Sequence, residues 1–156
     1  MNLARRLAGV LLACGLAAGC ESPTAPSEDG SLTLHTVAKA TVSNHSAQGV
    51  RTVVRDPGRW QAVWAQLWGE RAPALPDVDF EHEMVVVASG ALVCFAEVRV
   101  ESVNDRAGGV HVGLADSGPS SSCLCAVPET TLHAVRVRRV EGAVEFTVRT
   151  IPPTCG

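Results

Sequence analysis

The feature that most constrains the fold is a tryptophan-rich segment between Asp56 and Gly69, which reads as one short amphipathic helix. Asp56 can cap the free N–H groups of a first helical turn, and Pro57 suits the first helical position because its missing N–H is not needed there. One face of the segment is apolar, with helical spacing at Trp60, Val63, Trp64 and Leu67. The segment therefore predicts a helix over 57–68 that is packed against a sheet, with a ligand platform as the alternative.

Most of the remaining chain has the pattern of strands. Met84 to Ala88 is apolar at every position, as in a strand buried on both faces. The segments around Val98 to Glu101 and Val110 to Leu114 alternate between apolar and polar residues, as in strands with one face in water. We expect an α+β fold in which an antiparallel, mostly-β sheet or partial barrel of about six to eight strands is combined with the helix at 57–68.

The sequence also predicts a hairpin at the carboxyl end of the chain. Thr131 to Val140 and Ala143 to Thr150 are separated by Glu141-Gly142, which suits a two-residue turn. The register of that hairpin places Val137 opposite Phe146 and Val135 opposite Val148 on the core face, and Arg138 opposite Glu145 on the solvent face. The arginines at 136, 138 and 139 are interpreted as a solvated strand face, with a binding patch as the alternative.

The amino-terminal segment has the organisation of a secretory signal. Arg5 and Arg6 precede an apolar run that is too short to span a bilayer, and small residues lead to Cys20. Residues 16–20 resemble a bacterial lipobox, so we expect a signal peptide over 1–19, lipidation of Cys20, a flexible tether over 20–30 and one globular domain over 31–156. Glu21 resembles the outer-membrane sorting pattern. The alternative is ordinary secretion with cleavage after a small-residue triplet.

Charge argues against nucleic acid as a partner. The chain has 13 Lys and Arg and 16 Asp and Glu. Removal of Arg5 and Arg6 with the signal leaves 11 against 16, a net charge of −5. A nucleic-acid-binding domain usually carries a basic surface.

Four cysteines remain after Cys14 leaves with the signal and Cys20 takes the lipid: Cys94, Cys123, Cys125 and Cys155. An even number in an exported domain predicts two disulfides. We expect the pairs Cys94–Cys123 and Cys125–Cys155, although four cysteines allow three pairings. The alternative is a thiol-disulfide redox protein that uses Cys123 and Cys125, or a metal-binding protein that uses the same two cysteines together with His133.

The acidic stretch before the buried strand is the candidate interaction loop. Its members are Asp77, Asp79, Phe80, Glu81, His82 and Glu83. Strand-like alternation points the carboxylates outward, and we interpret them as a solvated acidic rim rather than as ligands of Ca²⁺. His82 is the most plausible acid-base group, but no motif places a nucleophile beside it, so we expect a surface residue. No catalytic residue, metal or cofactor is predicted.

Two motifs of this region resemble a known family. Trp60-Gln-Ala-Val-Trp64, followed by Pro76-Asp-Val-Asp-Phe-Glu-His-Glu-Met-Val-Val86, is similar to the PrcB C-terminal domain family. The resemblance covers about residues 50–150. It implies an accessory or interaction domain in the bacterial envelope, and the family is named after a lipoprotein subunit of a surface protease complex.

Together these patterns predict a lipid-anchored protein of the outer membrane rather than an enzyme. We expect its domain to bind or scaffold another envelope protein, while the membrane is contacted through the lipid on Cys20.

Overall fold

The computed structural model of the protein describes residues 30–94, 96–118 and 127–153. Within these ranges the chain forms seven strands, one α-helix and two 3₁₀ turns. In chain order these elements are β1 (His35–Val42), η1 (His45–Ala47), β2 (Arg51–Val54), α1 (Pro57–Trp68), η2 (Gly69–Arg71), β3 (Glu83–Ser89), β4 (Val98–Arg106), β5 (Gly109–Asp116), β6 (Thr130–Arg138) and β7 (Ala143–Thr150). The predicted α+β fold with a mostly-β content is confirmed.

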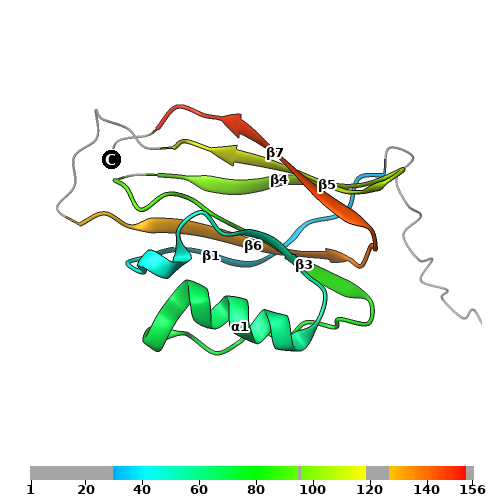
Figure 1. The fold of residues 1–156 in the computed structure, drawn as a ribbon, viewed down its shortest axis with the longest axis horizontal. Coiled ribbons are helices and arrows are strands. Elements are labelled where there is room, and N and C mark those ends of the chain that lie inside the picture. Colours follow the sequence, from blue (N-terminus) through cyan, green and yellow to red (C-terminus); the bar gives the residue numbers. More distant parts are fainter. Residues whose placement is uncertain (1–29, 95, 119–126, 154–156) are drawn as a thin grey trace, which may run out of the picture.

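The elements are arranged in three layers, which Figure 1 shows stacked one above another. The central sheet has the strand order β1-β6-β3-β2, and the outer sheet has the order β4-β5-β7. Helix α1 covers the face of the central sheet that is opposite the outer sheet (Figure 1). The strands thus form two packed sheets, and one pair, β5 with β7, is parallel.

Helix α1 has the bounds and caps that the sequence predicts. The Asp56 side chain accepts a hydrogen bond from the Arg59 N–H at 2.8 Å, and Gly69 ends the helix with φ 63°. The predicted apolar face is buried, with Trp60, Val63, Trp64 and Leu67 at 5% exposure or less. This face packs on the central sheet, so the prediction of a core helix is confirmed.

The central sheet supplies both hydrophobic cores. Met84 and Val86 of β3 pack against the outer sheet. Val85 and Val87 of the same strand pack against α1. Strand β6 divides its side chains in the same way, because successive residues of a strand point to opposite faces. The prediction that β3 is buried on both faces is confirmed.

The predicted hairpin of the last two strands is wrong. β6 lies in the central sheet between β1 and β3, whereas β7 lies in the outer sheet beside β5. Phe146 is therefore paired with Val112 rather than Val137, and Arg138 forms an ion pair with Asp105 at 3.2 Å rather than with Glu145. The physical reason is that β1 and β3 occupy both edges of β6, which leaves no edge for β7. Residues 139–142 instead carry the chain from one layer to the other.

None of the helices in the described ranges has both the length and the apolar character that a membrane crossing requires.

Candidate functional site

The candidate interaction loop is held along α1 by two tryptophans. The indole N–H of Trp60 donates to the Pro76 carbonyl at 3.0 Å, and that of Trp64 donates to the Pro73 carbonyl at 2.9 Å. The two rings are in contact, with centroids 5.1 Å apart. These side chains therefore fill the core and fix the path of the loop, because a buried indole N–H needs an acceptor. The two prolines restrict the same backbone further.

The acidic part of the loop is a tight turn centred on Asp79. The Asp79 carboxylate accepts a hydrogen bond from the Glu81 N–H at 3.1 Å, and its carbonyl accepts one from the Glu83 N–H at 2.7 Å. Asp is favoured in such turns because its short side chain can bond the backbone two residues on. The turn brings the chain directly into β3, which begins at Glu83.

Arg139 is the main support of this turn from the central sheet. Its guanidinium donates to the Phe80 carbonyl at 2.5 Å and to the Arg55 carbonyl at 3.0 Å. Its backbone N–H donates to the His82 carbonyl at 2.7 Å, and its Nε donates to the Glu141 carboxylate at 2.7 Å. One residue thus joins the acidic turn, the end of β2 and the crossing between the two sheets.

The structure separates the predicted loop residues into two groups. Asp77, Asp79, Glu81 and His82 are exposed. Phe80 is half-buried against the helix-side core, and Glu83 is half-buried at the start of β3, where it forms an ion pair with Arg136 at 3.5 Å. The predicted strand-like alternation is wrong between 80 and 82, because the Asp79 hydrogen bonds form a turn there. Glu83 is therefore not part of the exposed group.

The exposed group contains one strong internal contact. His82 Nδ1 lies 2.8 Å from a carboxylate oxygen of Asp79. This hydrogen bond lowers the pKa of Asp79 and raises the pKa of His82. Asp79, Glu81 and His82 each offer one metal-ligating atom, and these atoms lie within 4.8 Å of one another. All three are exposed, and Ca²⁺ takes about six to eight oxygen ligands, so this cluster alone does not define a metal site.

A hollow of about 460 Å³ lies beside the loop. It is lined by Leu34, His35, Thr36, Val37, Pro76, Asp77 and Arg136. Asp77 and Arg136 place opposite charges on its wall, and the Leu34 and Val37 side chains add apolar surface. The hollow is thus suited to a polar side chain of a partner and is continuous with the exposed loop residues.

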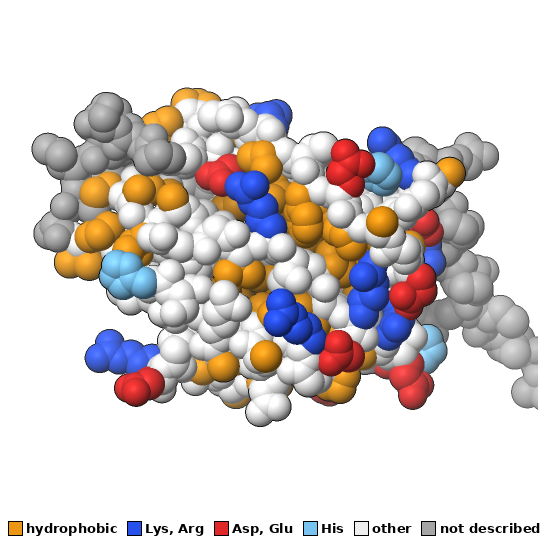
Figure 2. All heavy atoms as spheres, in the orientation of Figure 1, with side chains coloured by type: hydrophobic (Ala, Val, Ile, Leu, Met, Phe, Trp, Pro, Cys, Tyr) orange, Lys and Arg blue, Asp and Glu red, His pale blue; other side chains and the backbone are white. Residues whose placement is uncertain are grey.

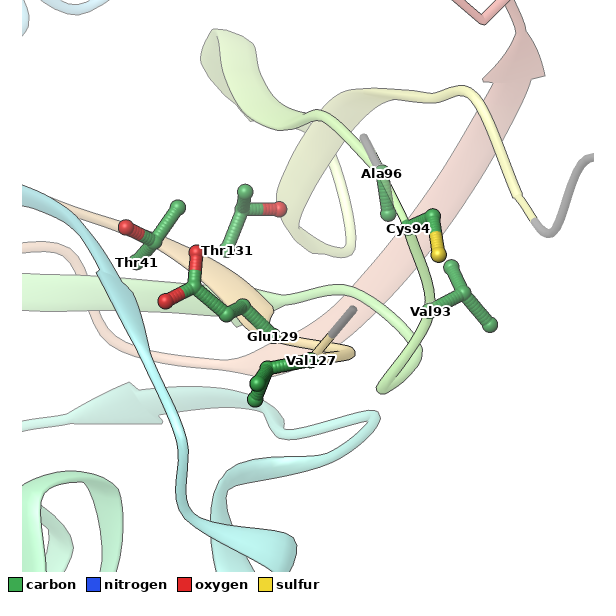
Figure 3. A pocket seen from close by; sticks show the side chains of 7 residues that line it. All are labelled: Thr41, Val93, Cys94, Ala96, Val127, Glu129 and Thr131. Carbon is green, nitrogen blue, oxygen red and sulfur yellow. The ribbon is translucent and has the colours of Figure 1, made fainter. Parts of the chain in front are cut away.

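The cysteine region is described only in part. Cys94 is disulfide-bonded, whereas Cys20, Cys123, Cys125 and Cys155 lie outside the described residues. Cys94 lines a second cavity of about 140 Å³ with residues of β1 and the start of β6. Figure 3 shows its lining, in which the Glu129 side chain reaches toward Thr41 and Thr131. The predicted pairings and the alternative redox pair stay predictions.

Sequence reasoning found the loop but missed the residue that supports it. The alternation of arginine and valine near 136–139 indicates a strand face, and the exposed Arg138 fits that interpretation. No local sequence pattern indicates the supporting role of Arg139, because its contact with Phe80 spans 59 positions of the chain. The tryptophan contacts have a weak signal, namely two tryptophans on one helix face followed by two prolines.

The fold and this surface define an α+β domain of two packed sheets with a rigidly supported acidic loop. Comparison with known proteins identifies no relative, since no family model, no curated protein and no solved structure matches the chain. The resemblance to the PrcB C-terminal domain family thus depends on the motif residues between Trp60 and Val86 alone.

Proposed function

We propose that this chain is a lipid-anchored envelope protein whose domain is a non-catalytic binding module for another envelope protein. The contact surface is the acidic loop formed by Asp77, Asp79, Glu81 and His82, together with the hollow beside Asp77. The complementary partner surface is basic. The resemblance to the PrcB C-terminal domain makes a surface protease complex one candidate assembly.

The observation that carries the proposal is the rigid support of exposed charges. Trp60 and Trp64 fix the backbone that leads into the loop, and Arg139 fixes the loop itself, so little conformational entropy is lost when a partner binds. The Asp77 and Glu81 side chains are exposed, and none of the ion pairs found among the described residues includes them. Acidic groups presented in this way favour recognition of a basic surface and increase the rate of encounter.

The membrane address is proposed from the sequence. The signal-like segment 1–19 and the tether 20–30 precede β1, so a lipid on Cys20 would hold the domain near the outer membrane at the end of a flexible linker. Labelled palmitate should be incorporated into the full chain and lost in Cys20→Ala. Persistent labelling of that variant would refute the anchor.

The loop is tested by site-specific photocrosslinking in intact cells. A photoreactive amino acid is placed at Asp77 or Glu81 in the full chain, and a matched control carries it at Glu70, which is exposed at the opposite end of α1. We expect one defined product from both loop positions and none from Glu70. Products that are equal at all three positions would contradict a specific loop contact.

Charge removal gives a second, quantitative measurement. Asp77→Asn combined with Glu81→Gln keeps the shapes of the side chains and removes two charges, and Glu70→Gln removes one charge elsewhere. Once the crosslinked partner is known, the loop variant should associate more slowly, on the order of tenfold at low salt. The control should associate at the wild-type rate. Equal rates would show that the acidic charges do not guide binding.

A further inference from the structure

The two sheets have four edge strands, and three of them carry features that discourage pairing with another strand. β1 contains a bulge between Thr36 and Ala38 and carries Lys39. β2 is four residues long. β4 contains a bulge, and its second edge is partly covered by residues 30–32. There the Leu32 N–H donates to the Val103 carbonyl, and the Asp105 N–H donates to the Gly30 carbonyl. Three of the four edges are thus short, irregular or partly covered.

The fourth edge strand, β7, lacks these features. It has eight residues, contains no proline or lysine, and keeps one continuous register with β5. Within the described ranges no segment pairs with its second edge. A long regular edge of this kind is a template for an added strand.

The hydrogen-bonding direction of β7 follows from its last contact with β5. The Ile151 N–H donates to the Asp116 carbonyl at 3.1 Å. Because alternate residues of a parallel strand direct both backbone groups to the same side, residues 145, 147 and 149 also face β5. The N–H and C=O groups of Val144, Phe146, Val148 and Thr150 therefore face the free edge.

The side chains on the inner face of β7 are incompletely covered. Val144 and Phe146 are half-buried against the core, while Val148 is 43% exposed. Figure 2, in the orientation of Figure 1, shows hydrophobic side chains reaching the surface between the two sheets, with basic side chains beside them. An additional strand next to β7 would extend the outer sheet over this apolar seam.

The sequence of β7 is complementary to itself in one antiparallel register. A two-fold axis at Thr147 places Glu145 opposite the partner's Arg149, and Phe146 opposite the partner's Val148. Opposite charges, an aromatic with a β-branched residue, and Thr147 with the partner's Thr147 are all favourable cross-strand pairs. The hydrogen-bonding pattern agrees, because Phe146 and the partner's Val148 both present free backbone groups, whereas Thr147 forms a non-hydrogen-bonded pair.

We propose that β7 is a self-association edge, through which two copies of this chain join their outer sheets into one continuous antiparallel sheet. The occupant is a second copy because the strand's own charges and apolar residues supply the matching partners. The inference is independent of the acidic loop, which lies on the other side of the central sheet with α1.

Of the two ion pairs already present on β7, that of Glu145 is compatible with this pairing, whereas that of Arg149 must be exchanged. Arg149 uses Nε and Nη2 for Glu101, at 3.3 and 2.7 Å. Glu101 belongs to β4, on the side of β7 away from the free edge, so Arg149 must exchange this contact for the partner's Glu145 when the dimer forms. Glu145 uses one carboxylate oxygen for His111 at 3.1 Å, which leaves its second oxygen for the partner.

Disulfide trapping tests the proposed register. In a non-hydrogen-bonded antiparallel pair the Cα atoms are about 4.5 Å apart, which is within the range that a disulfide spans. The full chain with Thr147→Cys, purified in detergent and mildly oxidised, should therefore form a covalent dimer on non-reducing electrophoresis. Ala143→Cys is the matched control, because Ala143 is exposed, takes part in none of the pairs named above, and is separated from its copy by about 27 Å in this register. The parent chain controls for the native cysteines.

Three results of trapping would overturn the proposal. These are the absence of a Thr147→Cys dimer, equal dimer formation by Ala143→Cys, and, when trapping is performed in cells, a product that contains a different protein.

A charge exchange tests the pairing without a covalent bond. Arg149→Glu places like charges opposite each other across the axis, so the dimer seen by sedimentation should weaken at least tenfold. Adding Glu145→Arg to the same chain restores opposite charges and should recover the dimer. Thermal melting confirms that each variant is folded. A monomeric wild-type chain, or a double variant that stays monomeric while folded, would refute the self-association edge.

Discussion

At the residue scale, Arg139 supports more of the candidate surface than any other single side chain of the described chain. It is half-buried, and its guanidinium bonds two carbonyls from distant segments as well as the Glu141 carboxylate. The hydrogen bond with Arg139 also lowers the pKa of Glu141. Removing a charged donor from such a position leaves partly buried carbonyl groups without this partner.

Arg139→Ala should therefore decrease the free energy of unfolding by about 1.5–3 kcal/mol, since hydrogen bonds to charged groups contribute this much. The amides of residues 79–83 should exchange with deuterium faster than in the wild type, because the turn loses its support. Arg138→Ala is the control, as that side chain is exposed and forms an ion pair with Asp105. Faster exchange in the control variant to the same extent would contradict the role of Arg139.

His133 is a second residue whose contacts join distant elements. Its Nδ1 accepts a hydrogen bond from the Val100 N–H at 3.0 Å, which links the central sheet to the outer sheet. An accepting Nδ1 places the proton of the neutral ring on Nε2, which lies 3.2 Å from the Thr36 hydroxyl. Burial, followed by the charges of Lys39 and Arg99, lowers the pKa of His133.

This lowered pKa predicts a pH dependence of stability. Histidine in the unfolded chain has a pKa of about 6.5. Below that pH the unfolded state therefore binds more protons at this position than the folded state does. The contribution of His133 is full above this pH and decreases as the pH falls through it. Urea unfolding at several pH values should show a loss of stability toward pH 5 that is smaller in His133→Asn, whose amide oxygen can still accept from Val100.

The difference between the wild type and His133→Asn also separates the contribution of His133 to the pH dependence of stability from that of His82. The pKa of His82 is raised by Asp79, so its contribution has the opposite sign: it is present at low pH and is lost as the pH rises through the folded pKa. That contribution is common to both chains and cancels in the difference. Identical pH profiles for wild type and variant would contradict the role of His133.

At the scale of elements, local patterns predicted α1 and β3 correctly, whereas the partners of β6 and β7 were not predictable. A cap at Asp56, helical spacing and an apolar run act within a few residues, so they can be recognised in the sequence. The choice of neighbouring strand depends on which edges are free after β1 and β3 have paired with β6. Proximity in sequence favoured a hairpin, but burial of β6 on both faces favoured the centre of the sheet.

The same distinction applies to the candidate site. Its acidic residues are adjacent in sequence and were predicted. The turn at 80–82 was not predicted, because it depends on hydrogen bonds that Asp79 accepts from the N–H groups of the residues after it. The supporting role of Arg139 and the hollow between β1 and the loop were not predictable, because both depend on contacts between distant segments.

The entry of β7 into the outer sheet depends on a close backbone approach. Gly109 has φ 147°, and a Cβ atom there would overlap the Ala143 carbonyl at the start of the β5–β7 pair. Its neighbour Gly108 also has positive φ, at 109°, but a Cβ atom would meet nothing within 4 Å.

Gly108→Ala should therefore decrease the free energy of unfolding by about 1–3 kcal/mol through backbone strain alone. Gly109→Ala should decrease it further, because the steric overlap is added to the strain. Urea unfolding of both variants measures the difference. Equal losses would mean that β7 does not approach Gly109 as closely as described.

At the scale of the whole molecule, the central sheet couples the three layers. Alternate residues of β3 and β6 contribute to the core under α1 and to the core between the sheets. Loss of either core removes packing from strands that the other core also needs. A small domain organised in this way is expected to unfold in a single cooperative step.

The distribution of tryptophan makes this coupling measurable. All three tryptophans, Trp60, Trp64 and Trp68, lie in α1, and the chain has no tyrosine. Tryptophan fluorescence thus reports the helix layer alone, while far-ultraviolet circular dichroism reports the secondary structure of all three layers, most of whose residues are in strands. The midpoints of urea unfolding from the two probes should coincide.

Leu67→Ala tests whether the layers stay coupled when one core is damaged. Leu67 is fully buried on the helix side, so the substitution should decrease the free energy of unfolding by about 2–5 kcal/mol. Because β3 and β6 belong to both cores, the fluorescence and circular dichroism transitions should move to lower urea together. A fluorescence transition that moves alone would show that α1 detaches while the two sheets stay folded, and the helix would then be a separate unit rather than part of one cooperative domain.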